Sequence, residues 1–196
     1  MFLARRPSPL AIDRFLRESH DLPTSYGPVG LVKEACPDRR VDEEVVAIGH
    51  GREDFERARA ALMTWKQCDI GWLQVFPQRT PVAVGTIVAV LIRHLGFWSL
   101  NGCRVVYDVG GQRDTRFGYA HGTLVNHAEA GEEIFEVFVD AETDNVMYRI
   151  RAASWARAPL AWLGQPVVRV LQARFRRDSV EAMRRAVRLR NRHETP

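Results

Sequence analysis

The stretch Arg116–Asp140, RFGYAHGTLVNHAEAGEEIFEVFVD, decides the fold of this chain. It predicts two strands, over about 116–125 and 131–140, joined by a polar connection. Side chains along a strand alternate between two faces, so one face of the first strand carries Tyr119, His121 and Thr123. One face of the second strand carries Glu133, Phe135, Val137 and Val139. An isolated hairpin is marginal in water, so the rest of the chain must supply more strands and an element that covers one face.

Helices and strands are predicted before this stretch. Ser8 and Pro9 suit the N-cap and the first position of a helix. Apolar residues at helical spacing, with acids in the first turn, predict a second helix that begins at Arg52. Gly96 separates two segments rich in Val and Ile, which favours a hairpin with a tight turn. The expected elements are, in order, helix 9–19, strand 41–48, helix 52–67, and strands 71–76, 84–95 and 97–109.

A strand and a long helix are predicted after it. Alternation over Val146–Ser154 is typical of a half-exposed strand. Pro159–Leu163 begins a helix, and we expect Gly164–Pro166 to interrupt it, because proline lacks a backbone donor and clashes with the preceding turn. From Pro166 the apolar residues recur every three or four positions, which predicts an amphipathic helix of roughly 25 residues.

This order of elements predicts an α+β fold of the helix-grip type. A strongly twisted antiparallel sheet curls, and its concave face must be covered. The C-terminal helix is the only predicted element long enough to cover it. We therefore expect a curved antiparallel sheet of about six to seven strands wrapped on that helix, with a cavity between them. The chain divides into an N-terminal helix and linker (1–25), the helix-grip domain (26–190) and a tail (191–196).

The composition of the 196 residues, 46% hydrophobic and 27% charged, is that of a soluble globular protein. Of the 28 basic residues only Lys33 and Lys66 are lysines, a bias that favours a GC-rich, bacterial source. No signal peptide or membrane-spanning run is evident, so we expect a cytoplasmic protein. The three cysteines, which form no CxxC pair, argue against a disulfide framework or a zinc site, and they are Cys36, Cys68 and Cys103.

Arginines are concentrated near the C-terminus, where residues 169–192 hold nine of them against Asp178 and Glu181. A basic helix can attract RNA or anionic lipid, and it would then act as an interaction module. A solvated helix face is the simpler explanation. We expect no DNA partner and keep binding to an anionic surface as a weak alternative.

The residues that could carry chemistry lie in the opening stretch, in its two strands and in the connection between them. The phosphate-binding and nucleophile motifs, GxxxxGK[ST], GxGxxG, GxSxG and HExxH, are absent, so no cofactor is expected. His121, His127 and Glu129 have a spacing that could bring two nitrogens and an oxygen to one end of a sheet. Solvation in a polar loop explains His127 and Glu129 more simply, so we predict no metal.

Glu132 and Glu133 point to opposite faces of a strand and cannot act together on one substrate. An inward Glu133 could perform general acid–base chemistry with His121. The simpler expectation is that Glu133 pairs with Arg104 or Arg149 across the sheet.

Several motifs point to a known family when they are taken together. Phe117-Gly-Tyr-Ala-His-Gly-Thr-Leu124 and His127-x-Glu129-x-Gly-Glu-Glu133-x-Phe135 resemble the DUF1990 (UPF0548) family. The similarity spans about Tyr26 to Val187. The family is a domain of unknown function, so the resemblance supports a fold and supplies no catalytic residues. The order of elements resembles the START/Bet v 1-like (SRPBCC) superfamily, whose members commonly hold apolar ligands beneath the C-terminal helix.

These observations lead to one main functional hypothesis and two alternatives. We expect a cytoplasmic protein that holds a small apolar ligand, lipid-, isoprenoid- or polyketide-like, between the sheet and the C-terminal helix. The expected ligand-binding residues are Trp98, Asn101, Arg104, Tyr107, Tyr119, His121, Thr123, Phe135 and Tyr148. One alternative is an enzyme of the same fold, a cyclase or hydrolase, using His121 and a carboxylate. The other is the interaction module with its arginine-rich helix.

Overall fold

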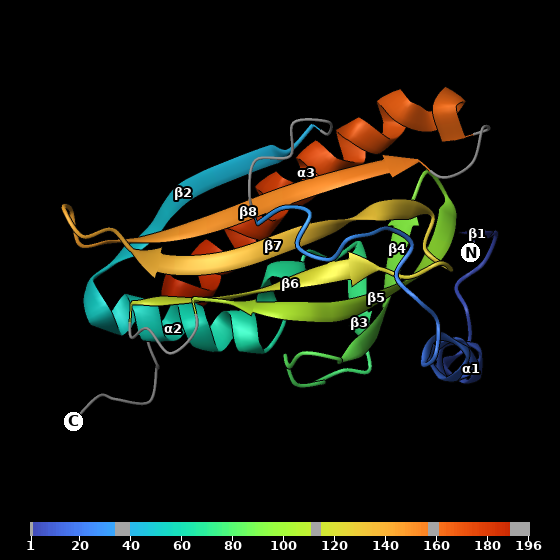
Figure 1. Cartoon of the computed structure of the whole chain (residues 1–196), viewed down its shortest axis with the longest axis horizontal. Coiled ribbons are helices and arrows are strands. Elements are labelled where there is room, and N and C mark those ends of the chain that lie inside the picture. Colours follow the sequence, from blue (N-terminus) through green and yellow to red (C-terminus); the bar gives the residue numbers. More distant parts are fainter. Residues whose placement is uncertain (1, 34–39, 111–114, 157–160, 189–196) are drawn as a thin grey trace.

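The computed structural model describes residues 2–33, 40–110, 115–156 and 161–188 (Figure 1). Within these ranges eight strands form one sheet. The strands are β1 (Phe2–Leu3), β2 (Asp42–His50), β3 (Leu73–Phe76), β4 (Ile87–His94), β5 (Phe97–Val109), β6 (Arg116–Thr123), β7 (Glu129–Val139) and β8 (Asn145–Ala156). The helices are α1 (Pro9–Ser19), α2 (Gly51–Met63) and α3 (Ala161–Arg188), with a 3₁₀ helix, η1, over Lys66–Cys68.

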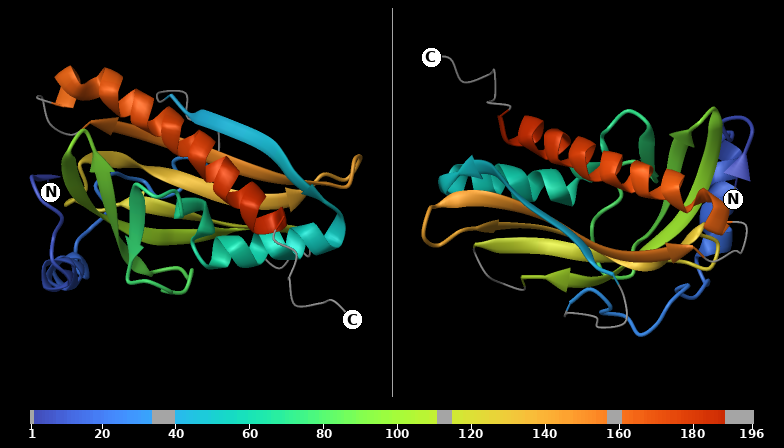
Figure 2. Two further views of the ribbon diagram at one scale, coloured as in Figure 1. Left: turned by 180° about the vertical axis from the view of Figure 1, so that it is seen from behind. Right: turned by 90° about the horizontal axis from the view of Figure 1, so that it is seen from above.

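The sheet is antiparallel along its main path, β2-β8-β7-β6-β5-β4-β3, and β1 pairs with β5. Strands β3 to β8 follow one another as a meander, whereas β2 closes the far edge beside β8. The sheet curls, and α3 crosses its concave face diagonally (Figure 2). The α+β helix-grip prediction is therefore confirmed.

The β4–β5 hairpin turns within two residues. His94 pairs with Phe97, and the residues between them, Leu95 and Gly96, have φ values of 49° and 80°. Two successive positive values are typical of a type I′ turn, whose twist matches that of the flanking strands. The tight turn expected at Gly96 is confirmed.

A bulge in β5 changes which side chains face α3. The register against β6 shifts between Val105 and Tyr107. Cys103 and Val105 belong to the core beneath α3, whereas Tyr107 packs on the opposite face. An extra residue in one strand disrupts the regular alternation of faces. Simple alternation along β5 therefore fails at Tyr107.

The concave face carries an aromatic core under the C-terminal half of α3. Tyr119, Phe135 and Tyr148 are fully buried there and share one cluster with Met183. The hydroxyls of Tyr148 and Ser179 lie 2.8 Å apart and join β8 to α3. These contacts fix the helix on the sheet and fill that end of the interface.

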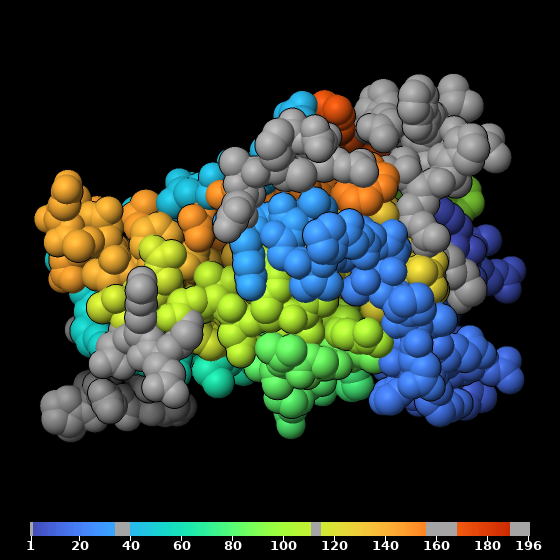
Figure 3. All heavy atoms as spheres, viewed as in Figure 1, coloured from blue at the N-terminus to red at the C-terminus, as the bar shows by residue number. Residues whose placement is uncertain are grey.

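The convex face is covered by different elements. Ile12 and Phe15 of α1 pack against β4 and β5. The segment 20–33 lies across the middle of the sheet (Figure 3). Val32 of this segment belongs to a separate buried cluster with Tyr107. Both faces of the sheet are thus buried, the convex face by α1 and the segment 20–33 and the concave face by α2 and α3.

Two helix predictions need correction. α3 is continuous from Ala161 to Arg188, so the interruption expected at Gly164–Pro166 is wrong. Pro166 removes one backbone donor, but a 28-residue helix keeps its other hydrogen bonds and its packing on the sheet. α2 ends at Met63 and not at Gln67, because Trp65 has a left-handed backbone (φ 60°) and η1 follows. The helix start expected at Pro159 lies outside the described residues.

Candidate functional site

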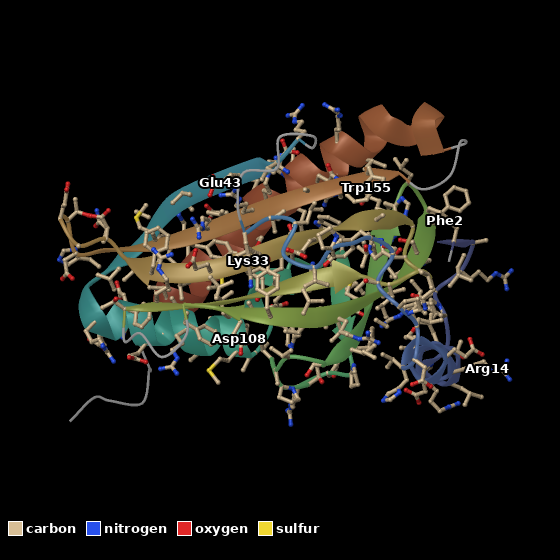
Figure 4. All side chains as sticks on the ribbon, viewed as in Figure 1. Phe2, Arg14, Lys33, Glu43, Asp108 and Trp155 are labelled. Carbon is tan, nitrogen blue, oxygen red and sulfur yellow. The ribbon has the colours of Figure 1, made fainter. Side chains whose placement is uncertain are left out.

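A cavity of about 230 Å³ lies between the concave face of the sheet and the N-terminal half of α3. Its apolar wall includes Val90 and Cys103 from the sheet and Leu171 and Phe175 from α3. Phe2 of β1 also lines it, and Figure 4 shows this side chain at one end of the sheet. The cavity is a part of the helix–sheet interface that the described side chains leave unfilled.

One row of side chains crosses the cavity wall. His121 of β6 pairs with Glu133 of β7, which pairs with Ala152 of β8. His121 Nε2 and Glu133 Oε2 are 3.2 Å apart. The two side chains are only 13% and 20% exposed, and the His121 ring meets Phe135 edge-on at 5.3 Å. Such a histidine–carboxylate pair can position and exchange a proton inside the cavity.

This pair corrects the expectation that Glu133 would bind an arginine. Arg104 lies on the convex face and donates to two backbone oxygens of the N-terminal segment, at 3.0 Å each. Arg149 binds Glu136, which is also on the convex face. Strand alternation is the physical reason, because each arginine occupies a position whose neighbours in sequence face α3.

Glu129 joins the sheet to α3 at the edge of the cavity. Its Oε1 accepts a hydrogen bond from Gln172 Nε2 at 3.0 Å, and that nitrogen lies 2.9 Å from Ser154 Oγ. Burial, and then the charge of Glu133, raise the pKa of Glu129 above its ordinary value of 4.5. The sequence predicts a solvated loop at Glu129, but the structure places this residue in β7.

Asn101 and Thr123 also line the cavity, but their polar atoms bind the protein itself. The Asn101 amide donates to Ser99 Oγ at 3.0 Å, and its oxygen accepts from the backbone of Ala128 at 3.3 Å. Thr123 Oγ1 accepts from the backbone N–H of Gly131 at 2.8 Å. Both side chains therefore hold neighbouring strands and loops in place.

Two free cysteines, Cys68 of η1 and Cys103 of β5, complete the cavity wall. Burial, and then the charge of Glu133, raise the pKa of both thiols. A thiol must ionise to act as a nucleophile. These cysteines thus serve as small apolar groups.

The other six predicted binding residues do not line the cavity. Trp98, Arg104 and Tyr107 lie on the convex face, so they cannot be its walls. Tyr119, Phe135 and Tyr148 face α3 but are buried in the aromatic core beside the cavity. Sequence reasoning missed Cys68, Leu171 and Gln172. Gln172 stands in the run Gln172-x-Arg-Phe175, which also resembles the DUF1990 family, and no local pattern singles out the other two.

The carboxylate of Glu132, next to Glu133, has its hydrogen-bonding capacity filled by donors of the protein itself. It lies on the convex face and accepts hydrogen bonds from four donors, which are the hydroxyls of Tyr26 and Tyr107 and the backbone N–H groups of Gly30 and Val32. Burial and the contact with this carboxylate raise the pKa of both tyrosines. Lys33, labelled in Figure 4, lies 4.1 Å from the Tyr107 ring.

The described residues contain no group of three His, Cys, Asp or Glu side chains placed to hold a metal ion. His127 instead accepts the Glu129 backbone N–H at 2.9 Å through Nδ1. This local turn explains its position beside Glu129 and separates it from His121.

The described arginines of α3 are largely engaged by acids. Arg174 and Arg177 bind Asp178, Arg176 lies 3.7 Å from Glu44 of β2, and Arg184 binds Glu181. These pairs support the solvated-face explanation of the basic helix. Within the described ranges, no helix has an apolar run long enough to cross a membrane.

A protein-family model settles the family. The model described as "Domain of unknown function (DUF1990)" matches residues 25–182. The chain belongs to the DUF1990 family. A UPF0548 protein of Dictyostelium discoideum is 31% identical over 95% of this chain and 96% of its own length. A UPF0548 protein of Arabidopsis thaliana is 36% identical over 70% of this chain and 68% of its own length.

The DUF1990 fold is similar to that of a solved structure with a different sequence. The Zhui aromatase/cyclase from Streptomyces sp. R1128 has a TM-score of 0.53 and 12% sequence identity, and the match covers 78% of this chain and 96% of that one. At this identity the likeness concerns the fold alone. The relatives include an amoeba and a plant, so the bacterial source stays a prediction, as does the domain boundary at residue 25.

Proposed function

We propose that this DUF1990 protein binds a small, largely apolar molecule in the cavity between the sheet and α3. The observation that carries the proposal is the cavity of about 230 Å³, with apolar walls, in an interface that is otherwise closely packed. Ligand sites are typically concave and apolar with a few polar groups that orient the ligand. His121 and Glu133 are such groups.

The cavity volume narrows the class of ligand. An apolar cavity of about 150 Å³ can hold benzene, whereas drug-sized ligands usually occupy about 300–1,000 Å³. A cavity of about 230 Å³ therefore fits a compact molecule of one or two rings. Among the classes expected from the sequence, small aromatic polyketide-like molecules suit it better than long-chain lipids.

Thermal unfolding with naphthalene tests this proposal. A ligand that binds only the folded state raises the unfolding temperature. We expect naphthalene to stabilise the wild type but not Ala152→Phe, whose added ring would occupy the cavity. Val45→Phe, on an exposed part of β2, introduces the same side chain outside the cavity and should respond like the wild type. Equal responses from Ala152→Phe and the wild type would contradict the proposal.

An enzymatic role is the second candidate, and the His121–Glu133 pair is the observation that favours it. The carboxylate orients the imidazole, an arrangement suited to proton transfer. The test is to extract any small molecule that co-purifies with the protein, incubate it with the protein in D₂O and follow deuterium incorporation by mass spectrometry. The wild type should exchange carbon-bound hydrogen and a folded His121→Ala should not; no exchange by the wild type would reject this role.

A further inference from the structure

The carboxylates that line the cavity can accept more hydrogen bonds than the protein donates to them. Glu129 and Glu133 lie on the same face of β7, on either side of Gly131, and both line the cavity. An ionised carboxylate can accept about four hydrogen bonds. Glu132 on the opposite face shows that this strand can fill that capacity where the site is structural.

In each of the two cavity carboxylates, one oxygen has a partner and the other does not. Glu133 Oε2 lies 3.2 Å from His121 Nε2, and Glu129 Oε1 accepts from Gln172. The second oxygen of each carboxylate has no hydrogen bond to any described residue. Both of these oxygens keep some solvent-accessible surface, so both remain accessible.

Four of the other polar side chains on the wall have their groups engaged by the protein and supply no donor to these oxygens. The amide of Asn101 and the hydroxyl of Thr123 are bound to the protein's own groups. Arg176 lies against Glu44, and Asp42 binds Arg40 at 2.9 Å. No described side chain donates to the two free oxygens, so a molecule that enters the cavity can do so.

We infer that the natural ligand carries a hydrogen-bond donor, a hydroxyl or an amine, on a compact ring body, and that Glu133 and Glu129 receive this donor. The inference rests on the proposed function and deepens it. The ring packs against Cys103 and Phe175, while the donor faces β7. The same carboxylates repel anions, so an acidic molecule with an identical ring is excluded.

Titration calorimetry with four molecules of one ring size tests the inference, using 1-naphthol, 1-naphthylmethylamine, naphthalene and 1-naphthoate. A hydrogen bond to a charged group contributes roughly 1.5–3 kcal/mol, so we expect at least one donor-bearing probe to bind about tenfold or more tightly than naphthalene. Naphthoate should bind more weakly than naphthalene. The neutral alcohol and the cationic amine distinguish hydroxyl from ammonium recognition, and a preference for either supports the inference.

Glutamine variants test which carboxylate causes the preference for donor-bearing probes. Glu133→Gln should reduce the preference for the donor-bearing probe severalfold and Glu129→Gln should reduce it less, while both relieve the exclusion of naphthoate. Glu142→Gln, in the exposed turn before β8, makes the same change of charge and should behave like the wild type. Unfolding temperatures of all three variants confirm that each is folded.

Two results would overturn the inference without touching the proposed function. In one, naphthalene and both donor-bearing probes bind the wild type equally, which would mean that water satisfies the carboxylates. In the other, the preference survives in the Glu133→Gln/Glu129→Gln double variant. Failure of every probe, naphthalene included, would reject the proposed function itself.

Discussion

Glu132 and Glu133 are neighbours on β7, yet their carboxylates lie on opposite faces of the sheet and differ in the number of donors that they bind. Glu132 is 2% exposed and its carboxylate receives four donors from the segment before β2 and from β5. Among the described residues Glu133 has one hydrogen-bond partner, His121, and it borders a cavity. A saturated buried carboxylate stabilises the fold, whereas an unsaturated one beside an open space is available for a ligand.

The largest expected effect is the loss of the Glu132 carboxylate. Glu132→Ala leaves four buried donors without an acceptor, and each unsatisfied buried group costs roughly 1–3 kcal/mol. We expect the free energy of unfolding to fall by about 3 kcal/mol or more, measured by urea denaturation. A loss below about 1 kcal/mol would remove the distinction between the two glutamates.

Gly122→Ala should weaken the same site indirectly. A Cβ at this position would overlap the Tyr26 hydroxyl, which donates to Glu132 at 2.7 Å. Losing a hydrogen bond to a charged group costs roughly 2 kcal/mol of unfolding free energy. Because a Cβ at Gly122 would overlap the hydroxyl and also the ring atoms Cε1 and Cζ of Tyr26, the double variant Gly122→Ala/Tyr26→Leu, which lacks all three atoms, should cost little more than Tyr26→Leu alone. Additive losses would mean that the alanine acts elsewhere.

Glu133→Gln should change stability much less than the Glu132 variant. The amide oxygen of glutamine can still accept a hydrogen bond from His121, so the change leaves no buried donor unsatisfied and should cost about 1 kcal/mol or less. The same urea measurement checks this expectation. A loss as large as that of Glu132→Ala would assign Glu133 to the fold and weaken the case for a binding role.

The smallest effect concerns pH. The raised pKa of Glu129 means that, from pH 4.5 upward to that pKa, the folded chain holds more protons than the unfolded chain. Its contribution to the free energy of unfolding therefore falls as the pH rises through this window, as the buried carboxyl ionises near Glu133. Glu129→Gln should gain stability relative to the wild type as the pH rises from 4.5 through the raised pKa of Glu129, measured from unfolding temperatures. Parallel pH profiles would contradict this expectation.

Much of the fold could be predicted from local patterns. Alternation and turn residues locate β4 to β8 within a few positions, and the length of the last helix identifies the element that the sheet wraps. The predicted interruption at Pro166 was wrong because the backbone hydrogen bond lost at one proline is small beside the stabilisation from the packing of a long helix. β1 has two residues, too few for a periodic signal.

The candidate site could be predicted only in part, for two different reasons. Trp98 and Arg104 stand at even positions of β5 and Asn101 at an odd one, so alternation alone could have separated the two faces. Tyr107 also stands at an odd position, but it lies on the convex face because of the bulge in β5, which no sequence pattern predicts. The contact between His121 and Glu133 depends on strand register, and the cavity depends on where α3 crosses the sheet.

The most direct measurement of the central claim is an anomalous-diffraction map from crystals soaked in 1-bromonaphthalene. If the space beneath α3 is a binding site for a compact apolar molecule, the bromine peak will lie in the cavity bounded by Val90, Cys103 and Phe175. The peak should vanish in Ala152→Phe. A cavity without bromine in the wild type, or bromine bound only on the convex face, would contradict the account.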